Sequence, residues 1–240
     1  MKLYVINLDR DVERLAAQKE QFAKFGISFE RIPAFQDAPR NLFRWWCAVL
    51  RPVVKGELGC AASHCECYRR QLESGSDCAA VFEDDVVCGE LIGTALEEAG
   101  KFCMENPKAV VLLGNHHEGK AGCLASGNAY DGGDVKIVPE TWDHCAEGYV
   151  IGREAAATLL RKQSPVRVPI DWWGYFSKKG WIDLYRIEPS VCAQQTERFL
   201  SNIGERYVAN KAGFLEHVWW RIQRLIGVSL DTLMDGRAGW

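Results

Sequence analysis

The sequence predicts an α/β domain with a mainly parallel, twisted sheet flanked by helices, because short apolar segments alternate with longer amphipathic ones. Residues 2–8 begin the chain as a buried strand. Residues 9–25 follow as a charged helix that Gly26 ends, and residues 27–35 alternate as a second strand. A strand, a helix and a strand in this order form a βαβ unit, in which the two strands run parallel.

The alternation continues as far as residue 162. Apolar residues at helical spacing occur in three further segments, residues 56–71, 91–102 and 153–162. Short runs typical of strands occur in four, residues 79–82, 109–113, 136–139 and 149–151. Residues 36–54 and 114–133 predict long loops, which in a compact domain are usually functional or poorly ordered.

The composition is that of a globular protein and excludes several classes of function. The 240 residues include 29 basic and 32 acidic side chains, a formal net charge of −3, so no bulk electrostatic field favours nucleic acid. The apolar run at the N-terminus has only four residues, whereas a secretory signal needs about 7–15. We therefore expect a cytoplasmic protein.

Ten cysteines are present, and without an export signal we expect them to be reduced. Cys78, Cys88, Cys103 and Cys192 stand singly among apolar neighbours, where a thiol packs as a small hydrophobe. The segment 64–67, His-Cys-Glu-Cys, is the exception. Its two thiols point to opposite sides of a helix, and no second Cys/His pair has zinc-site spacing, which argues against a structural zinc ion there.

Three consecutive acids, Glu83, Asp84 and Asp85, directly follow an apolar strand. Burying unpaired carboxylates costs several kcal/mol each, so we place them at the carboxyl edge of the sheet, where α/β proteins bind ligands. Clustered carboxylates suit a hard divalent cation shared with phosphate oxygens. The alternative is a solvated acidic turn.

Basic side chains follow the first strand. Arg10 and Arg14 are four residues apart, on one face of the predicted helix, and guanidinium groups suit bidentate binding of phosphate. The alternative is a pair of surface arginines that bridge Asp11 or Glu13.

In six short motifs, which occur in the same order, the chain resembles glycosyltransferase family 25. The motifs are residues 5–10 with Arg14, residues 56–60 with Ser63 and His64, residues 81–86, residues 148–151 with 153–156, residues 168–171, and Pro189 with Gln194 and Ser201. The likeness extends over residues 1–205, which we interpret as one catalytic domain, followed by a helical tail at residues 206–240.

The resemblance implies a GT-A-type fold and transfer of a sugar, usually from UDP-galactose, with inversion at the anomeric carbon. The family includes enzymes that build bacterial lipooligosaccharide, so the resemblance implies a glycan or glycolipid as the acceptor. A divalent ion, Mn²⁺ or Mg²⁺, would be held through Asp85 with Glu83 or Asp84 assisting, and would neutralise the departing diphosphate. The implied donor-binding residues are Asn7, Arg10, Arg14, Asp84 and Ser201.

Inversion requires a base for the acceptor hydroxyl, and Asp171 in the family's Pro-x-Asp motif is our candidate. Trp172 and Trp173 follow it and predict an aromatic platform for the acceptor sugar. Alternatives stay open: Asp171 as the N-cap of the next helix, and Asp143 or Glu147 as the base.

Three further predictions concern histidines, the tail and an alternative function. For His64 we expect a structural hydrogen bond to the sheet edge, and His144 could be a third metal ligand. Residues 206–240 form an apolar helical stripe flanked by basic residues, which suits the surface of an anionic membrane or packing on the domain. A second hypothesis is a catalytically silent protein that binds a sugar nucleotide or glycan. A third is a metal-dependent phosphohydrolase.

Overall fold

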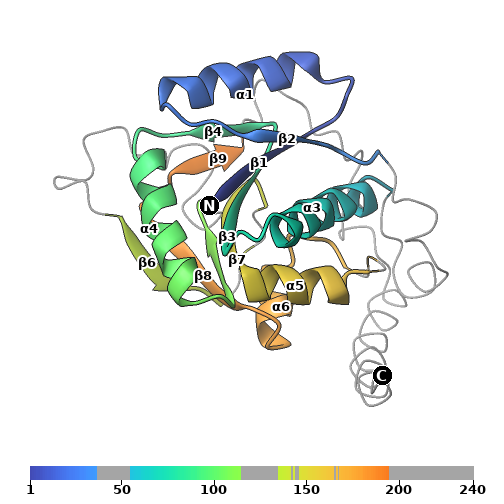
Figure 1. The fold of residues 1–240 in the computed structure, drawn as a ribbon, viewed down its shortest axis with the longest axis vertical. Coiled ribbons are helices and arrows are strands. Elements are labelled where there is room, and N and C mark those ends of the chain that lie inside the picture. Colours follow the sequence, from blue (N-terminus) through green and yellow to red (C-terminus); the bar gives the residue numbers. More distant parts are fainter. Residues whose placement is uncertain are drawn as a thin grey trace, which may run out of the picture.

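The structure is a computed structural model that describes residues 1–36, 55–114, 135–141, 143, 146–164, 166 and 168–194, and the statements below concern those residues. A seven-stranded sheet has the strand order β2-β1-β3-β7-β5-β8-β6, and a two-stranded sheet pairs β4 with β9. Helices lie on both sides of the larger sheet (Figure 1). The predicted α/β class is therefore confirmed.

The N-terminal part of the large sheet is parallel. The predicted βαβ unit consists of β1 (Lys2–Asn7), α1 (Val12–Lys24) and β2 (Glu30–Pro33). On the other side of β1, β3 (Cys78–Glu83) also runs parallel to it, with Ile6 opposite Glu83. Because parallel strands end on the same side, the residues that follow β1 and β3 meet at one edge of the sheet.

The C-terminal part of the sheet contains two reversed strands. β7 (Gly148–Gly152) runs antiparallel between β3 and β5 (Ala109–Leu112). At the far edge, β6 (Lys136–Pro139) is antiparallel to β8 (Asp183–Glu188), which is parallel to β5. Five of the seven strands therefore share one direction, so the sheet is mainly parallel, as predicted.

Three strands were not predicted from the sequence. β4 (Val86–Cys88) and β9 (Cys192–Gln194) have three residues each and pair only with one another, which is too short for a periodic signal. In β8 the buried residues are Leu184 and Ile187, three positions apart, so the strand lacks the period of two that identifies half-buried strands.

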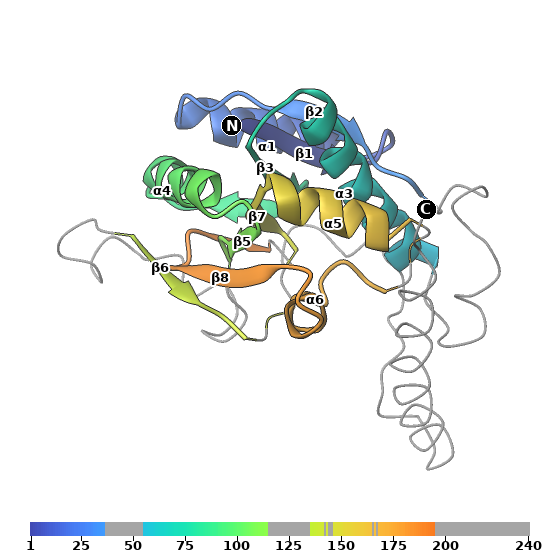
Figure 2. The same ribbon diagram turned by 60° about the horizontal axis from the view of Figure 1, so that its bottom comes forward.

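Both faces of the large sheet are buried, because successive side chains of a strand point to opposite sides. Along β1, Tyr4 and Ile6 join one apolar cluster and Val5 joins the other. The first cluster lies under α3 (Lys55–Glu73), α5 (Arg153–Lys162) and α6 (Trp173–Lys178), and α3 packs beside α5 (Figure 2). The second lies under α4 (Ile92–Glu105) and α1.

The predicted helices at residues 56–71, 91–102 and 153–162 correspond to α3, α4 and α5. Among the elements described, none is a helix long and apolar enough to cross a bilayer. The predicted tail at residues 206–240 lies outside the described residues, as does almost all of the two predicted long loops.

Candidate functional site

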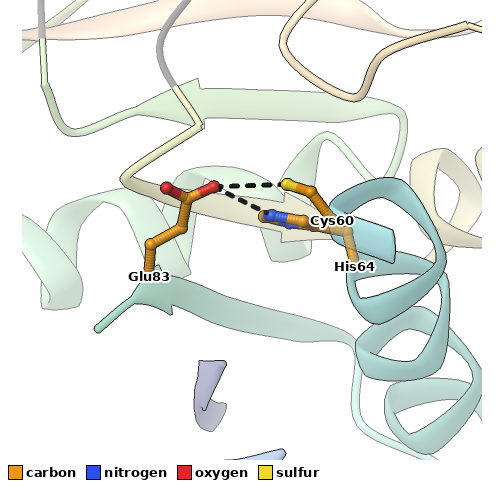
Figure 3. Close-up of side chains that lie close together, drawn as sticks. All are labelled: Cys60, His64 and Glu83. Carbon is orange, nitrogen blue, oxygen red and sulfur yellow. Dashed lines mark hydrogen bonds and ion pairs between the residues drawn. The ribbon is translucent and has the colours of Figure 1, made fainter. Parts of the chain in front are cut away.

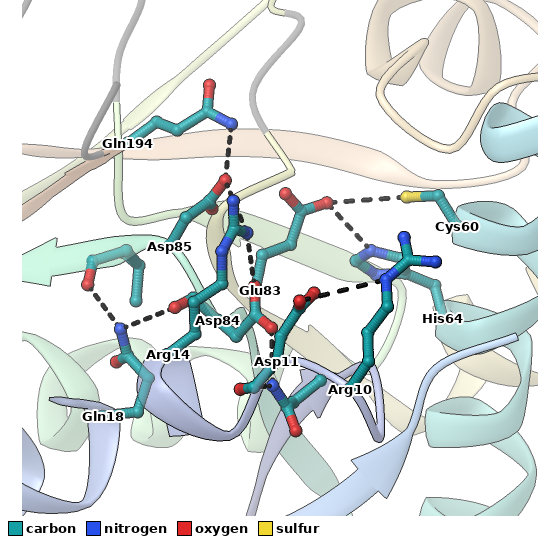
Figure 4. Close-up of polar contacts among 12 residues, drawn as sticks. Arg10, Asp11, Arg14, Gln18, Cys60, His64, Glu83, Asp84, Asp85 and Gln194 are labelled. Carbon is teal, nitrogen blue, oxygen red and sulfur yellow. Dashed lines mark hydrogen bonds and ion pairs between the residues drawn. The ribbon is translucent and has the colours of Figure 1, made fainter. Parts of the chain in front are cut away.

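The acidic triplet and the first strand meet at the carboxyl edge of the sheet, as the sequence predicted (Figure 4). Asn7 is the last residue of β1 and Glu83 the last residue of β3. Asp84 and Asp85 form the turn between β3 and β4. Each of the three acids has a different environment, and together these environments define the site.

Asp84 is held by the N-terminal segment of the chain. Its Oδ1 accepts a hydrogen bond from Arg14 Nη1 at 2.8 Å, and its Oδ2 accepts one from Asn7 Nδ2 at 2.7 Å. Arg14 is itself buried on α1, so the pair is shielded from water. Burial nevertheless raises the pKa of Asp84 above its ordinary value, against the lowering effect of Arg14 and Asn7.

These contacts change the interpretation of three predicted donor-binding residues. Asn7 also donates to the Asp11 carbonyl at 3.0 Å and accepts from Arg31 Nε at 2.9 Å, so its amide is engaged within the protein. Arg14 faces the acidic turn, rather than Asp11 or Glu13 as the alternative reading had it. The structure gives Asn7, Arg14 and Asp84 the role of a buried polar brace, and direct contact with a donor stays a prediction.

Asp85 is the least satisfied of the three acids. Its Oδ2 accepts a hydrogen bond from Gln194 Nε2 at 3.0 Å and lies 3.6 Å from Arg14 Nη1. Its Oδ1 is buried and has no hydrogen-bond partner among the residues that the structure describes. Burial, followed by the negative charge of Glu83, raises the pKa of Asp85 from 3.8 to about 6. A buried carboxylate oxygen without a partner fits a cation ligand, because a cation would supply the missing interaction.

The sequence did not predict that Gln194 would lie beside Asp85. It ends β9, which pairs with β4 directly after the acidic turn, and Val86 lies opposite Gln194. The residue stood in a family motif but had no assigned role. Gln194 and Asp85 are 109 residues apart in the sequence, and the pairing of β4 with β9 brings the Gln194 amide to the carboxylate.

Glu83 turns its carboxylate toward α3 (Figure 3). Its Oε1 lies 3.5 Å from His64 Nε2 and 3.5 Å from Cys60 Sγ. His64 is fully buried, and its Nδ1 lies 2.7 Å from the hydroxyl of Tyr149 on β7. His64 thus makes a structural hydrogen bond to Tyr149 of the sheet and lies beside Glu83 at its edge.

The motif that carries Cys60 and His64 anchors the beginning of α3 to the chain after β2. Ser63 Oγ accepts a hydrogen bond from the Phe35 backbone N–H at 2.9 Å and donates to the Gly59 carbonyl at 2.7 Å. A methyl group on Gly59 would lie 2.3 Å from the Phe35 carbonyl oxygen, so only glycine permits this close approach. The anchoring brings Cys60 and His64 to the sheet edge.

Arg10 precedes α1 instead of sharing its face with Arg14, since the helix begins at Val12. Its side chain is 55% exposed, and Nε lies 3.9 Å from Asp11 Oδ1. The pairing with Asp11 is the alternative that the sequence had left open. Arg10 still lies at the acidic edge, as Figure 4 shows.

The aromatic segment after Asp171 divides into a buried and a half-buried ring. Trp173 is 0% exposed and packs edge-on against Tyr149, with ring centroids 4.8 Å apart. The prediction that Trp173 stacks on an acceptor sugar is corrected, because neither face of its ring reaches solvent. Trp172 is half-buried and is the N-cap residue of α6, so Asp171 lies one position before the cap.

The alternative bases are both buried, and one lies at the same edge. The Glu83 backbone N–H donates to the Glu147 carbonyl at 3.0 Å, which places Glu147 beside the end of β3. Asp143 is buried just before β7. His144 and Ser201 lie outside the described residues.

The sequence is similar to one family model and to several known glycosyltransferases. The sequence model of glycosyltransferase family 25 (LPS biosynthesis protein) matches residues 1–122. A lacto-N-neotetraose biosynthesis glycosyltransferase, LgtE of Neisseria gonorrhoeae, is 27% identical over 220 residues, covering 84% of this chain and 77% of that protein. LgtB of the same organism, with the same description, is 28% identical over 81% of this chain and 75% of its own length. A glycosyltransferase 25 family member of Anopheles gambiae is 23% identical over 70% of this chain and 30% of its own length.

Proposed function

We propose, from the premise that this chain belongs to glycosyltransferase family 25, that it is a metal-dependent inverting enzyme. In this proposal it moves galactose from UDP-galactose to a glycan acceptor such as lipooligosaccharide. Family membership makes it a glycosyltransferase with a sugar donor and a glycan acceptor. The metal, the stereochemistry and the identity of both substrates are the proposed part.

The observation that carries the proposal is the state of Asp85. Its Oδ1 is buried at the carboxyl edge of the sheet without a hydrogen-bond partner among the described residues, although its pKa is raised and the ionised form is costly there. Asp85, with Glu83 assisting, would hold Mn²⁺ or Mg²⁺. Such an ion, when bound, supplies positive charge to the departing diphosphate. Arg10, exposed at the same edge, is suited to hold a phosphate oxygen.

The proposed base is Asp171, which takes the proton from the acceptor hydroxyl as that oxygen attacks the anomeric carbon. Support comes from the packing of α6: Trp173, two residues later, contacts Tyr149, whose hydroxyl meets His64 beside Glu83. This chain of contacts links the beginning of α6 to the acidic edge. Trp172 is half-buried and remains the proposed acceptor platform.

The proposed acceptor rests on the relatives. Two of them are named for lacto-N-neotetraose biosynthesis, and the description of the family names lipopolysaccharide biosynthesis. A glycan of the bacterial surface is therefore the proposed acceptor class. The proposed membrane contact of residues 206–240 would bring the enzyme to a lipid-linked acceptor.

The first experiment measures donor hydrolysis and transfer with UDP-galactose, UDP-glucose and UDP-N-acetylglucosamine, with Mn²⁺ or with chelator. We expect turnover of UDP-galactose that requires the metal. Asp85→Ala should reduce it by at least about 100-fold, in line with the loss of one electrostatic stabiliser of the transition state. Asp183→Ala, at an exposed carboxylate at the beginning of β8, is the control and should keep full activity. Full activity of Asp85→Ala would refute the metal assignment.

The second experiment tests the base. Asp171→Asn should abolish transfer while leaving UDP-galactose affinity unchanged, because the amide cannot accept the proton. Donor affinity measured by calorimetry and the far-ultraviolet dichroism spectrum accompany the rate. Retained transfer would assign the base to another carboxylate, with Glu147→Gln as the next variant to compare.

A further inference from the structure

Cys60, His64 and Glu83 form a second cluster of possible metal ligands beside Asp85 (Figures 3 and 4). Cys60 and His64 are four residues apart on α3, so they lie on one face of the helix. Glu83 comes from the end of β3. One ligand atom from each of the three residues lies within 4.8 Å of the other two.

Two of the three ligand separations match those around one bound cation, and the third, between Cys60 Sγ and His64 Nε2, is within 4.8 Å. An N–H···O hydrogen bond normally measures about 2.7–3.2 Å, whereas His64 Nε2 and Glu83 Oε1 are 3.5 Å apart. With bond lengths of about 2.3 Å to sulfur and about 2.0–2.2 Å to nitrogen and oxygen, two ligands of a tetrahedral zinc ion lie about 3.3–3.6 Å apart. Cys60 Sγ and Glu83 Oε1 are also 3.5 Å apart.

The surroundings of His64 prepare its outer nitrogen for coordination. Nδ1 lies 2.7 Å from the Tyr149 hydroxyl, which in turn lies 2.7 Å from the Tyr68 hydroxyl, and all three side chains are buried. A hydrogen bond at one ring nitrogen fixes the ring and directs the other nitrogen to the metal, as is usual for zinc-bound histidines. The other ring nitrogen, Nε2, points toward Glu83 and Cys60.

The geometry points to a binding site for a Zn²⁺-class ion formed by Cys60 Sγ, His64 Nε2 and Glu83 Oε1 at the sheet edge. Thiolate and imidazole ligands select zinc over Mn²⁺ and Mg²⁺, which prefer oxygen ligands such as those of Asp85. Among the described residues the cluster supplies three ligands, the number that a catalytic zinc site takes from the protein. The thiol and imidazole ligands therefore distinguish this site from the all-oxygen site proposed at Asp85, with Glu83 between the two.

The test uses the full-length, reduced, metal-free protein titrated with Co²⁺, a spectroscopic substitute for zinc. We expect one equivalent of Co²⁺ to produce a thiolate-to-cobalt charge-transfer absorption in the near ultraviolet, which Zn²⁺ then displaces. Cys60→Ala should lose this absorption. Cys65→Ala, on the same helix but outside the cluster, should keep it. Glu83→Gln should weaken Co²⁺ binding by at least about tenfold, and Glu66→Gln on α3 should not.

Two further measurements keep the result unambiguous. Far-ultraviolet dichroism checks the fold of each variant, and Cys60→Ser replaces Cys60→Ala if the latter unfolds. Asp85→Ala should retain the absorption, which separates this site from the proposed Mn²⁺ or Mg²⁺ site. The proposal is overturned if wild-type protein shows no thiolate-to-cobalt absorption, or if the absorption survives the loss of the Cys60 thiol.

Discussion

Two neighbouring carboxylates at the sheet edge have opposite fates. Both oxygens of Asp84 receive strong hydrogen bonds from buried partners, whereas Asp85 has one oxygen bonded to Gln194 and one without a partner among the described residues. The hydrogen bonds of Asp84 therefore connect α1 and β1 to the end of β3. Folding leaves Asp85 in a costly state, which is typical of residues retained for function.

We predict that Asp85→Asn stabilises the protein at neutral pH. The pKa of Asp85 is raised to about 6 in the folded protein from 3.8, so the folded state binds the proton more tightly than the unfolded state. The stabilisation from that proton is complete below about pH 4 and is lost as the pH rises through 6. The neutral amide avoids the loss, and the gain above pH 7 is at most about 3 kcal/mol.

Chemical denaturation in the presence of chelator, at several pH values between 4 and 8, measures this difference. The gain in stability of Asp85→Asn over the wild type should grow with pH. The same substitution should lower the transferase activity. Asp183→Asn, at an exposed carboxylate, is the matched control and should show no such trend. A gain that is constant with pH would contradict the proposed cause.

At the scale of elements, the position of α3 determines whether Cys60 and His64 reach the sheet edge. Gly59 lets the helix approach the backbone after β2, and Ser63 bonds to both segments. The family motif thus combines a close approach, an anchor and two side chains that face Glu83. Gly59 and Ser63 are four residues apart, as are Cys60 and His64, so each pair lies on one face of α3.

We predict that Gly59→Ala destabilises the protein by about 1–3 kcal/mol. The added methyl group would lie 2.3 Å from the Phe35 carbonyl oxygen and 2.9 Å from that of Gln36, both backbone atoms that cannot move alone. This strain exceeds the gain of about 1 kcal/mol that alanine brings to a helix interior. Thermal denaturation measures the loss.

Gly93→Ala on α4 is the matched control for that prediction. A methyl group there meets no described atom within 4 Å, so the helical preference of alanine acts without strain. We expect it to stabilise the protein by up to about 1 kcal/mol. Equal effects of the two substitutions would show that the close approach of α3 costs nothing.

At the scale of the whole molecule, burial of the sheet on both faces accounts for the cysteines. Seven lie in the described part of the chain and none of those seven is in a disulfide. Six are buried: Cys65, Cys67, Cys78, Cys88, Cys103 and Cys192. They act as small apolar side chains, as predicted for Cys78, Cys88, Cys103 and Cys192 from their neighbours.

We predict that these six thiols resist alkylation in the native protein. Burial raises the pKa of Cys65 and of Cys88 to about 12, and that of Cys103 further, so little reactive thiolate forms at neutral pH. A short pulse of iodoacetamide followed by peptide mass spectrometry should label Cys60, which is half-buried, before any of them. In denaturant all should react. Rapid native labelling of Cys103 would show that the core opens readily.

The order of strands and helices could be derived from the sequence because it depends on local periodicity. β1, α1, β2 and β3 follow from apolar runs, and their parallel arrangement places the residues after Asn7 and Glu83 at one edge. The acidic triplet at that edge and its nearness to Arg14 were therefore predictable. So was the burial of Cys78, Cys88, Cys103 and Cys192 as small apolar side chains.

The partners of each side chain were not predictable, because they depend on contacts between distant segments. Whether an acid binds an arginine, faces a thiol or lacks a partner depends on how α3 and β9 approach β3 within a few tenths of an ångström. The same packing buries Trp173 and leaves Trp172 half-exposed, although both look alike in sequence. Local pattern therefore places chemical groups at an edge, and close packing of remote segments assigns each group its role.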